Sequence, residues 1–451
     1  MLCGAALTSC GDSFFEQYPA NEITEGNFYQ SDDDFNQGVR SCYAKLKTES
    51  GYYITELGYR SDESTLLAMA TSTQDRYDID HFQDVASNGI CADIWKAWYN
   101  GIYRCNDVLD HMTGKESLPN YRQYRGEALF IRSWFYFNLY RAFGVVPIAR
   151  NVVNPEAAKS IPRCSEQEMY NLLVSDLTEA ASLLPAKAGA EKARVTDIAA
   201  WTLLAKVQLT FKRHAEARAS LDEAIKNTSY GLMDNPADVF DVNKKFNKEL
   251  IFVLHYEKTN GEGHGHWYSQ KSNVLSEINS PSPELRALYS TDDQRRPLIW
   301  EYIKQGSLYV LKKWYDEYDA TYTSHVGNDF PFLRYADITL MYAEALAETS
   351  VSDALVWLNK TRTRAGLSEL TIAEVSTRDQ FIRALADERG REFALEGHRW
   401  FDLVRLGLAI ETMRAAGFTL DEHNLIFPIP QNQIEIVNNA SILWQNPGYN
   451  S

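Results

Sequence analysis

Apolar residues recur at the spacing of amphipathic helices through much of the chain. The pattern i, i+3, i+4 predicts four long helices, at residues 32–48, 91–111, 121–143 and 165–184. The third is apolar on nearly every side, which indicates a buried helix, and Gly144 and Pro147 end it. Strand patterns are weak. The sequence therefore predicts an all-α fold.

Two later segments share a pattern of small and large residues that is typical of helical hairpins. In each, two alanines stand 11 or 12 residues apart and a leucine follows four residues after the second: Ala205, Ala217 and Leu221, then Ala343, Ala354 and Leu358. Small residues let antiparallel helices approach closely, as in tetratricopeptide units. Because the copies lie far apart in the chain, we expect scattered hairpins rather than a regular solenoid. Ordinary Ala/Leu hairpins of an all-α protein are the alternative.

The helical period fades between residues 256 and 335. This stretch holds nine Tyr and three Trp against two Phe, whereas the rest of the chain has 24 Tyr and Trp against 18 Phe. A core favours Phe at least as much, while Tyr and Trp combine a flat apolar face with a polar group. The skew favours loops that present rings to solvent or to a ligand such as a sugar. A loop-rich subdomain with half-buried tyrosines is the alternative.

Charge and motifs exclude several functions. The chain has 451 residues, with 45 Lys and Arg against 61 Asp and Glu, and its net charge of -16 does not suit nucleic-acid binding. No apolar run is long enough to span a membrane. The six cysteines are too few for a disulfide scaffold, and Cys42, Cys91 and Cys105 lie in helical patterns as buried thiols. His264 and His266 lack a third ligand, and nucleotide and hydrolase motifs are absent, so we expect neither metal nor cofactor.

The densest charged segment is ADERGREFALEGHRWFDLVRLG, at residues 386–407. Glu388, Glu392 and Glu396 are four residues apart, which predicts one stripe on a helix. The arginines that follow are spaced to pair with Glu396 and Asp402; they are Arg391, Arg399 and Arg405. Two of the carboxylates could act as the general acid and base of an α-helical glycosidase. A general acid needs a raised pKa, however, and nearby arginines lower the pKa of a carboxyl group. We interpret the stripe as a structural ion-pair lattice.

Residues 1–10 read MLCGAALTSC and precede a polar segment. Leu7 to Cys10 resembles a bacterial lipobox, whose cysteine becomes the lipidated first residue. The stretch is short for a signal peptide and no Lys or Arg precedes it. We interpret it as a truncated lipoprotein signal that ends at Cys10; a chance cysteine near the start is the alternative. One acylated cysteine would anchor the protein to a membrane without spanning it.

Several segments, in one order along nearly the whole chain, resemble one family. They are SFFEQYPANEIT, WKAWYNGIYRCN, GEALFIRSWFYFNLYRAFGVVPI, LRYADITLMYAEAL, LNKTRTRAGL, ERGREFALEGHRWFDLVRLG, and the terminal FPIP and QNPGY. Together they resemble the SusD/RagB family, surface lipoproteins of the Bacteroidetes that capture nutrients at the outer membrane. The pattern departs at Asp337, where Glu is usual, and at Val145, where Gly or Asp is common.

The resemblance implies an all-α fold in which tetratricopeptide-like hairpins pack against a loop-rich ligand-binding subdomain. Residues 11–451 would form a single SusD-like domain, with hairpins mainly at 32–226 and 335–410 and the aromatic insert at 256–334. It also implies a partner, a TonB-dependent outer-membrane transporter of the SusC type, which the protein would cover like a lid. The family's ligands are oligosaccharides, or peptides in some members, and they are bound without catalysis.

The family's ligand sites do not form a motif, so we chose candidate ligand residues on physical grounds. Flat rings could stack on sugar faces, and charged groups could take paired hydroxyls. The candidates are Asp62, Arg76, Tyr77, Trp98, Trp267, Tyr268, Trp314 and Tyr315. We therefore expect a lipid-anchored, cell-surface oligosaccharide-binding protein of the outer membrane. The alternatives are a peptide-binding member, a glycosidase, and a helical scaffold without a small ligand.

Overall fold

The computed structural model describes residues 28–48, 57–65, 74–189, 191–260, 269–271, 280–305, 308–317, 321 and 327–449. The helices of these ranges are α1 (Asp32–Thr48), α2 (Gln74–Asp80), α3 (Gly89–His111), α4 (Tyr121–Phe143), α5 (Pro155–Ala158), α6 (Glu166–Leu183), α7 (Asp197–Thr210), α8 (His214–Ala224), α9 (Pro283–Ala287), α10 (Arg296–Trp300), α11 (Tyr335–Ala347), α12 (Val351–Arg364), α13 (Arg378–Glu392), α14 (Arg399–Leu406), α15 (Ala409–Ala415) and α16 (Gln431–Val437). The strands are β1 (Ser64–Thr65), β2 (Leu250–Leu254), β3 (Ser269–Lys271), β4 (Ser280–Pro281), β5 (Tyr302–Gln305), β6 (Leu308–Leu311) and β7 (Phe330–Arg334).

The predicted all-α fold and its four long helices are confirmed. Helices α1 and α4 have the predicted bounds, and α3 and α6 differ from them by one or two residues. Helix α4 is buried along most of its length and ends at Gly144, whose φ of 73° suits a residue without a side chain. Cys42, Cys91 and Cys105 are buried free thiols in helices, as expected.

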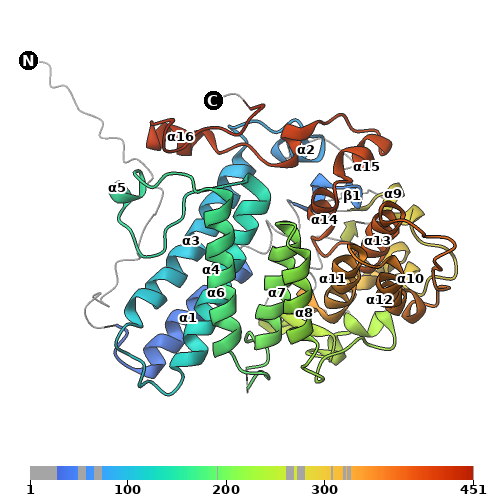
Figure 1. Cartoon of the computed structure of the whole chain (residues 1–451), viewed down its shortest axis with the longest axis horizontal. Coiled ribbons are helices and arrows are strands. Elements are labelled where there is room, and N and C mark those ends of the chain that lie inside the picture. The colour runs from blue at the N-terminus through green and yellow to red at the C-terminus, as the bar shows by residue number, and fades with distance from the viewer. Residues whose placement is uncertain are drawn as a thin grey trace, which may run out of the picture.

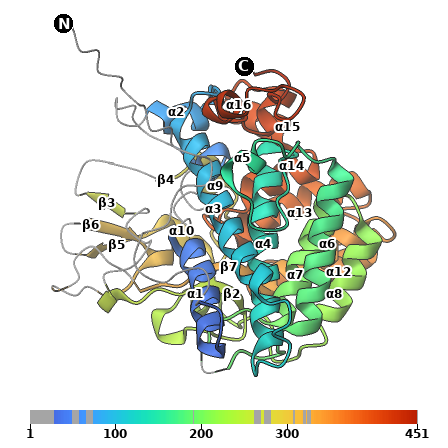
Figure 2. The same cartoon turned by 90° about the vertical axis from the view of Figure 1, so that its left-hand side faces the viewer.

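The long helices form one continuous stack. In order, α3 packs on α4, α4 on α6, α6 on α7, α7 on α8, α8 on α11, and α11 on α12 (Figures 1 and 2). The two predicted hairpins are α7–α8 and α11–α12, and their marker alanines and leucines are fully or almost fully buried. The expectation that these hairpins are scattered is wrong, because α8 lies directly against α11. Neighbouring repeats in space are thus separated in sequence by residues 225–334.

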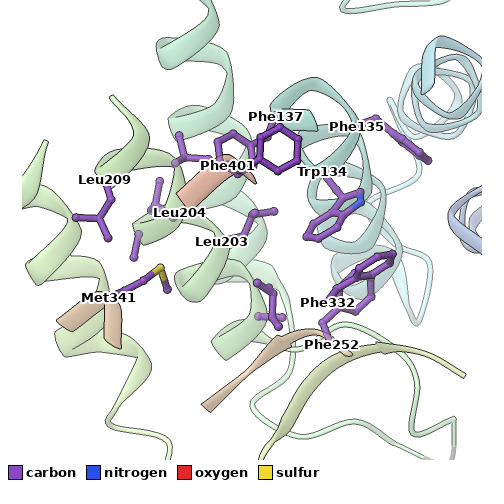
Figure 3. Close-up of a cluster of buried hydrophobic side chains, with 14 of the residues drawn as sticks. Trp134, Phe135, Phe137, Leu203, Leu204, Leu209, Phe252, Phe332, Met341 and Phe401 are labelled. Carbon is purple, nitrogen blue, oxygen red and sulfur yellow. The ribbon is translucent and has the colours of Figure 1, made fainter. Parts of the chain in front are cut away.

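A two-stranded antiparallel ladder closes the neck of the insert. Strand β2 pairs with β7, so the chain leaves the stack and returns to it at one place. Both strands are buried throughout. Figure 3 shows Phe252 of β2 and Phe332 of β7 beside Trp134 of α4, and the ring centroids of Phe332 and Trp134 are 4.5 Å apart. Packing against α4 therefore fixes the neck on the helical stack.

Beyond the neck, the insert carries a small antiparallel sheet in the order β3-β6-β5. Figure 2 shows this sheet on the opposite side of the molecule from α6, α8 and α12. Strand β4 pairs separately with β1, which follows α1 in the chain. The insert is therefore joined to the N-terminal region as well as to the stack. Within the described ranges, no helix combines the length and apolar character needed to cross a bilayer.

Buried ion pairs join the neck to the C-terminal helices. Arg334, the last residue of β7, contacts Glu249 at 2.7 Å, Glu392 at 2.6 Å and Glu396 at 2.8 Å. All four side chains are at most 2% exposed. Burial alone would lower the pKa of Arg334, but the three carboxylates hold it well above its usual range. The guanidinium is thus a fixed charge at the centre of the molecule.

Glu392 extends this network. It also pairs with Arg364 at the end of α12 and, at 2.7 Å, with Arg295 just before α10. Arg295 in turn contacts Glu388 at 2.8 Å. We call the set Glu249, Arg295, Arg334, Arg364, Glu388, Glu392 and Glu396 the neck network. It connects the insert with α12 and α13, so each side chain that it contains holds two or more elements together.

The structural role predicted for the acidic stripe is confirmed, but its geometry differs. Glu388 and Glu392 lie on α13, which ends at Glu392, and Glu396 follows in a turn where Leu395 has a φ of 61°. Of the predicted pairs, Arg405 with Asp402 is present at 2.8 Å.

The other arginines of the segment take different partners. Arg399 binds Asp62, and Arg391 contacts Glu388 at 3.1 Å. Glu396 binds Arg334 and Lys313 from the insert instead. Helix spacing accounts for Arg391 with Glu388, but it could not find the partners of Arg399 and Glu396, because these come from distant parts of the chain.

We expect Arg334→Ala to lower the free energy of unfolding by about 3–5 kcal/mol, because three buried carboxylates would lose their shared cation. Denaturant titration followed by circular dichroism measures this change. The control is Arg383→Ala, which removes the Arg383–Glu411 pair, whose side chains are 56% and 61% exposed, and should change stability little. Equal effects of the two substitutions would contradict a central role for the neck network.

Candidate functional site

A cavity of about 410 Å³ lies beside Asp62, between the segment that leads into β1, helix α9, and helices α13, α14 and α15. We call it the Asp62 cavity. Its charged lining residues are Asp62, Glu284, Arg383, Asp387, Arg399 and Glu411. Leucines and alanines of the four helices supply the rest of its wall. Apolar walls with a few charged groups are typical of small-ligand sites, and the volume falls in their range.

Asp62 is held in place by a bidentate ion pair. Its two carboxylate oxygens accept from Nε and Nη2 of Arg399, each at 2.7 Å, and Nη1 of Arg399 donates to the carbonyl of Ala386 at 2.8 Å. The Asp62 residue is 8% exposed. A carboxylate has about four lone-pair directions, so Asp62 can still accept hydroxyl donors from the cavity. The arrangement suits recognition of a polyol rather than catalysis.

Glu63, the next residue, is buried behind the cavity. Its Oε2 accepts from the backbone N–H of Leu395 at 3.1 Å. Burial raises the pKa of Glu63 to about 8, although that hydrogen bond and Arg399 oppose the rise. The Glu63 side chain is therefore a neutral acid at neutral pH, next to the ionised Asp62–Arg399 pair.

Trp300 is the most exposed aromatic ring that the structure describes in the insert. It ends α10 and is 40% exposed. The guanidinium of Arg296 lies 4.2 Å from the ring centroid and that of Arg286 lies 5.5 Å away. Cation–π contacts of this kind hold a ring in one orientation. Trp300 is thus a partly exposed flat ring held in one orientation.

Helix α9 connects Trp300 with the Asp62 cavity. Its Glu284 lines the cavity, as does Leu288 just after it, while Arg286 contacts Trp300. Residues 284 and 288 share a helix face and 286 points roughly the other way. The cavity and the ring therefore lie on different sides of one short helix. The insert, which the sequence predicted as the source of binding loops, carries Trp300 but supplies only Glu284 and Leu288 to the Asp62 cavity.

The predicted ligand residues fall into four groups: one that lines the cavity, three that are half-buried, two that are buried, and two outside the described residues. Asp62 lines the cavity. Arg76 and Tyr77 are half-buried on α2, which packs against the 3₁₀ turn Gly58–Arg60 ahead of Asp62, and Tyr77 stacks on His81 with centroids 3.8 Å apart. Tyr315 is half-buried after the turn Lys312–Trp314. Trp267 and Tyr268, like Cys10, lie outside the described residues.

Trp98 and Trp314 are core residues in the structure. Trp98 is 2% exposed on α3, and Trp314 is fully buried. The Trp314 ring stacks on Phe330 at 5.7 Å and meets Phe240 edge-on at 5.4 Å. The insert needs a core of its own, and Trp314 fills it, so neither ring has a free face for a sugar. Trp300 was missed because no pattern in the sequence separates an exposed Trp from a buried one.

Glu392 of the neck network is not suited to be the acid of a glycosidase pair. Burial would raise the pKa of Glu392, but Arg364, Arg334 and Arg295 hold it well below its usual range. A carboxyl that stays ionised in this way cannot act as a general acid. Among the described residues, no group of three or more His, Cys, Asp or Glu side chains is arranged to hold a metal ion.

Two family models match the chain. One, described as the SusD family, matches residues 301–449, and the other, described as starch-binding and associating with the outer membrane, matches residues 18–209. SusD-like protein P25 of Formosa agariphila is 25% identical over 95% of this chain and 94% of that protein. The chain belongs to the SusD/RagB family. The matched models describe a binding family rather than a family of enzymes.

Solved structures share the fold. A SusD superfamily protein from Bacteroides vulgatus has a TM-score of 0.78 and 23% identity, covering 94% of this chain and 100% of that one. Surface glycan-binding protein A of Bacteroides thetaiotaomicron, solved in complex with laminarihexaose, has a TM-score of 0.76 and 21% identity, covering 92% of this chain and 100% of that one. The predicted combination of tetratricopeptide-like hairpins and a loop-rich subdomain is therefore confirmed.

We expect Glu63→Gln to flatten the pH dependence of stability. The carboxyl pKa is about 4.5 in the unfolded chain and about 8 in the fold, so the folded protein binds more protons between these values. The contribution of the Glu63 carboxyl to the free energy of unfolding is fully present below pH 4.5 and is lost as the pH rises to 8. The loss is on the order of a few kcal/mol. Denaturant titrations at pH 5 and pH 8.5 measure the difference, which should shrink in the variant.

The control for this experiment is Glu284→Gln, which removes an exposed carboxylate of the same cavity. The free energy of unfolding of the wild type and of Glu63→Gln could instead change equally between pH 5 and pH 8.5. That result would show that the Glu63 side chain does not hold a proton in the folded state.

Proposed function

We propose that this protein captures oligosaccharides at the cell surface and delivers them to a TonB-dependent SusC-type outer-membrane transporter. The observation that carries the proposal is Trp300, an exposed ring held by Arg286 and Arg296, with the charged Asp62 cavity on the other side of α9. A flat apolar face flanked by hydrogen-bonding guanidinium groups matches the two kinds of surface on a sugar ring. The laminarihexaose complex of a protein with this fold supports the same ligand class.

The arrangement of the molecule supports simultaneous binding of an oligosaccharide and a transporter. The β3-β6-β5 sheet of the insert and helices α6, α8 and α12 of the stack lie on opposite sides of the molecule (Figure 2), so a ligand and a second protein could be bound together. We propose that the insert contacts the oligosaccharide and that the helical stack contacts the transporter. The family description that mentions the outer membrane supports this location, and lipidation of Cys10 would hold the protein there.

We expect the protein from Ser13 onward to bind one class of oligosaccharide in a calorimetric panel of plant, host and microbial glycans, with peptide mixtures included. Trp300→Ala should weaken that binding roughly tenfold, about 1.4 kcal/mol, because a stacking surface is lost. The matched control is Trp444→Ala, since Trp444 is also 40% exposed and carries its own arginine, Arg163, at 4.8 Å.

Three results would count against this proposal. Binding of peptides without glycans would assign the protein to a peptide-binding role within the family. Equal losses from Trp300→Ala and Trp444→Ala would move the site away from α10. If no glycan or peptide of the panel binds, a scaffold that binds only the transporter would be favoured.

Lipid anchoring makes a separate prediction. In cells that express the natural gene, Cys10→Ser should move the protein from the outer-membrane fraction to the soluble fraction, because the thiol is the site of acylation. Immunoblots of separated fractions measure the shift, and Cys3→Ser is the control. If the Cys10→Ser protein stays in the membrane fraction, Cys10 is not the anchor.

A further inference from the structure

A second cavity, of about 390 Å³, lies where the loop between α6 and α7 meets the segment that leads into β2. Figure 1 shows this loop at the lower end of α6 and α7. We call it the lysine cavity. Its charged and aromatic lining residues are Lys187, Lys192, Arg194, Tyr230, Lys245, Phe246 and Lys248. It shares no lining residue with the Asp62 cavity.

The charge of the lysine cavity is opposite to that of the whole protein. The chain carries a net charge of -16, yet five cationic side chains line this cavity and, among its described lining residues, none is Asp or Glu. Two stretches of the chain supply the charge: Lys187, Lys192 and Arg194 lie between α6 and α7, and Lys245 and Lys248 lie before β2. Such a local excess of one sign attracts ligands of the other sign.

Three of the cations already have partners. Arg194 contacts Glu127 at 2.8 Å and Glu191 at 2.9 Å. Lys245 donates to the carbonyl of Tyr256 at 2.6 Å and also contacts the carboxylate of Glu257. Lys248 contacts the exposed carboxylate of Asp234 at 3.4 Å.

The other two cations are available to a ligand. Lys187 and Lys192 are exposed, and over the described ranges neither has a carboxylate within ion-pair distance. They stand on the same loop, five residues apart, at the edge of the cavity. Two ammonium groups so placed can meet one or two anionic groups of a single ligand.

The walls also offer flat and polar surfaces. Tyr230 and Phe246 are half-buried, so part of each ring is accessible, and Ser229 adds a hydroxyl. Phe246 has a φ of 52°, a backbone conformation that bulky residues rarely adopt. The Phe246 ring packs against His255, with ring centroids 5.0 Å apart, and this contact holds the ring in the cavity wall. Lys245 and Lys248 lie on either side of Phe246 in the chain. Rings beside cations fit a sugar that carries negative charge better than they fit a bare inorganic ion.

We infer that the lysine cavity binds the carboxylate or sulfate groups of an acidic oligosaccharide, with Lys187 and Lys192 as its charge contacts. This inference rests on the proposed function and narrows its ligand class. Anionic groups would meet the two ammonium groups while a sugar ring covers Tyr230 or Phe246. Because the contacts are exposed, the affinity falls as the salt concentration rises.

The test is calorimetric titration of the protein with oligogalacturonate, a sulfated oligosaccharide, a neutral laminarin oligosaccharide and sodium sulfate. The double variant Lys187→Gln, Lys192→Gln should bind the acidic probes at least about tenfold more weakly, with a smaller dependence on salt. The matched control is Lys226→Gln, an exposed lysine on the turn after α8 that does not line the cavity.

The outcomes separate the two proposals. Loss of acidic-probe binding in the double variant, with neutral-probe binding unchanged, supports the inference. The inference is overturned if the double variant binds both acidic probes as tightly as the wild type does. It is also overturned if the wild type binds sodium sulfate as tightly as it binds the acidic probes. No binding of either acidic probe to the wild type also overturns it, whereas loss of neutral and acidic binding in Trp300→Ala concerns the proposed function alone.

Discussion

The fold depends on a cation buried at the neck of the insert. Arg334 reaches Glu249, Glu392 and Glu396, and these carboxylates come from the residue before β2, the end of α13 and the turn beyond it. A buried charge is costly unless its partners are complete, so each of these elements must be in place for the others to be stable. The network therefore does more than add stability. It makes the insert, the repeat stack and the C-terminal helices a single cooperative unit.

The candidate ligand surfaces follow from this constraint. The neck network and the β2–β7 ladder hold both ends of the insert, and Asp62 is tied to α14 through Arg399. Helix α9 then places Glu284 at the cavity and Arg286 at Trp300. Binding groups on a rigid scaffold lose little freedom when a ligand arrives, which favours affinity for weakly binding ligands such as sugars.

Local patterns in the sequence were enough for the four long helices and the two helical hairpins. The hairpins of α7–α8 and α11–α12 follow from the positions of Ala205, Ala217, Ala343 and Ala354, which are all buried. The contact of α8 with α11 could not be predicted, because it joins segments that the insert separates. The partners of Glu396 are distant for the same reason.

The candidate site was harder to predict than the fold. Asp62 was recognised as a charged loop residue, but its pairing with Arg399 involves residues 337 positions apart. Trp300 follows two apolar residues and Trp314 follows two lysines. Trp300 is nevertheless the exposed ring and Trp314 the buried one, which only the packing of the insert decides. The lysine cavity arises where two lysine-bearing segments meet, and neither segment indicates a site by itself.

The close packing of α8 on α11 has a consequence for how the chain folds. These helices can meet only after the chain between them, residues 225–334, has closed into a loop, and the entropy of that closure is lost before their contacts form. The cost grows only with the logarithm of loop length, about 0.6 kcal/mol for each doubling. Insertions beyond the neck would therefore slow folding slightly while leaving the stack intact. Ligand-binding loops of very different lengths can thus evolve on one unchanged helical frame.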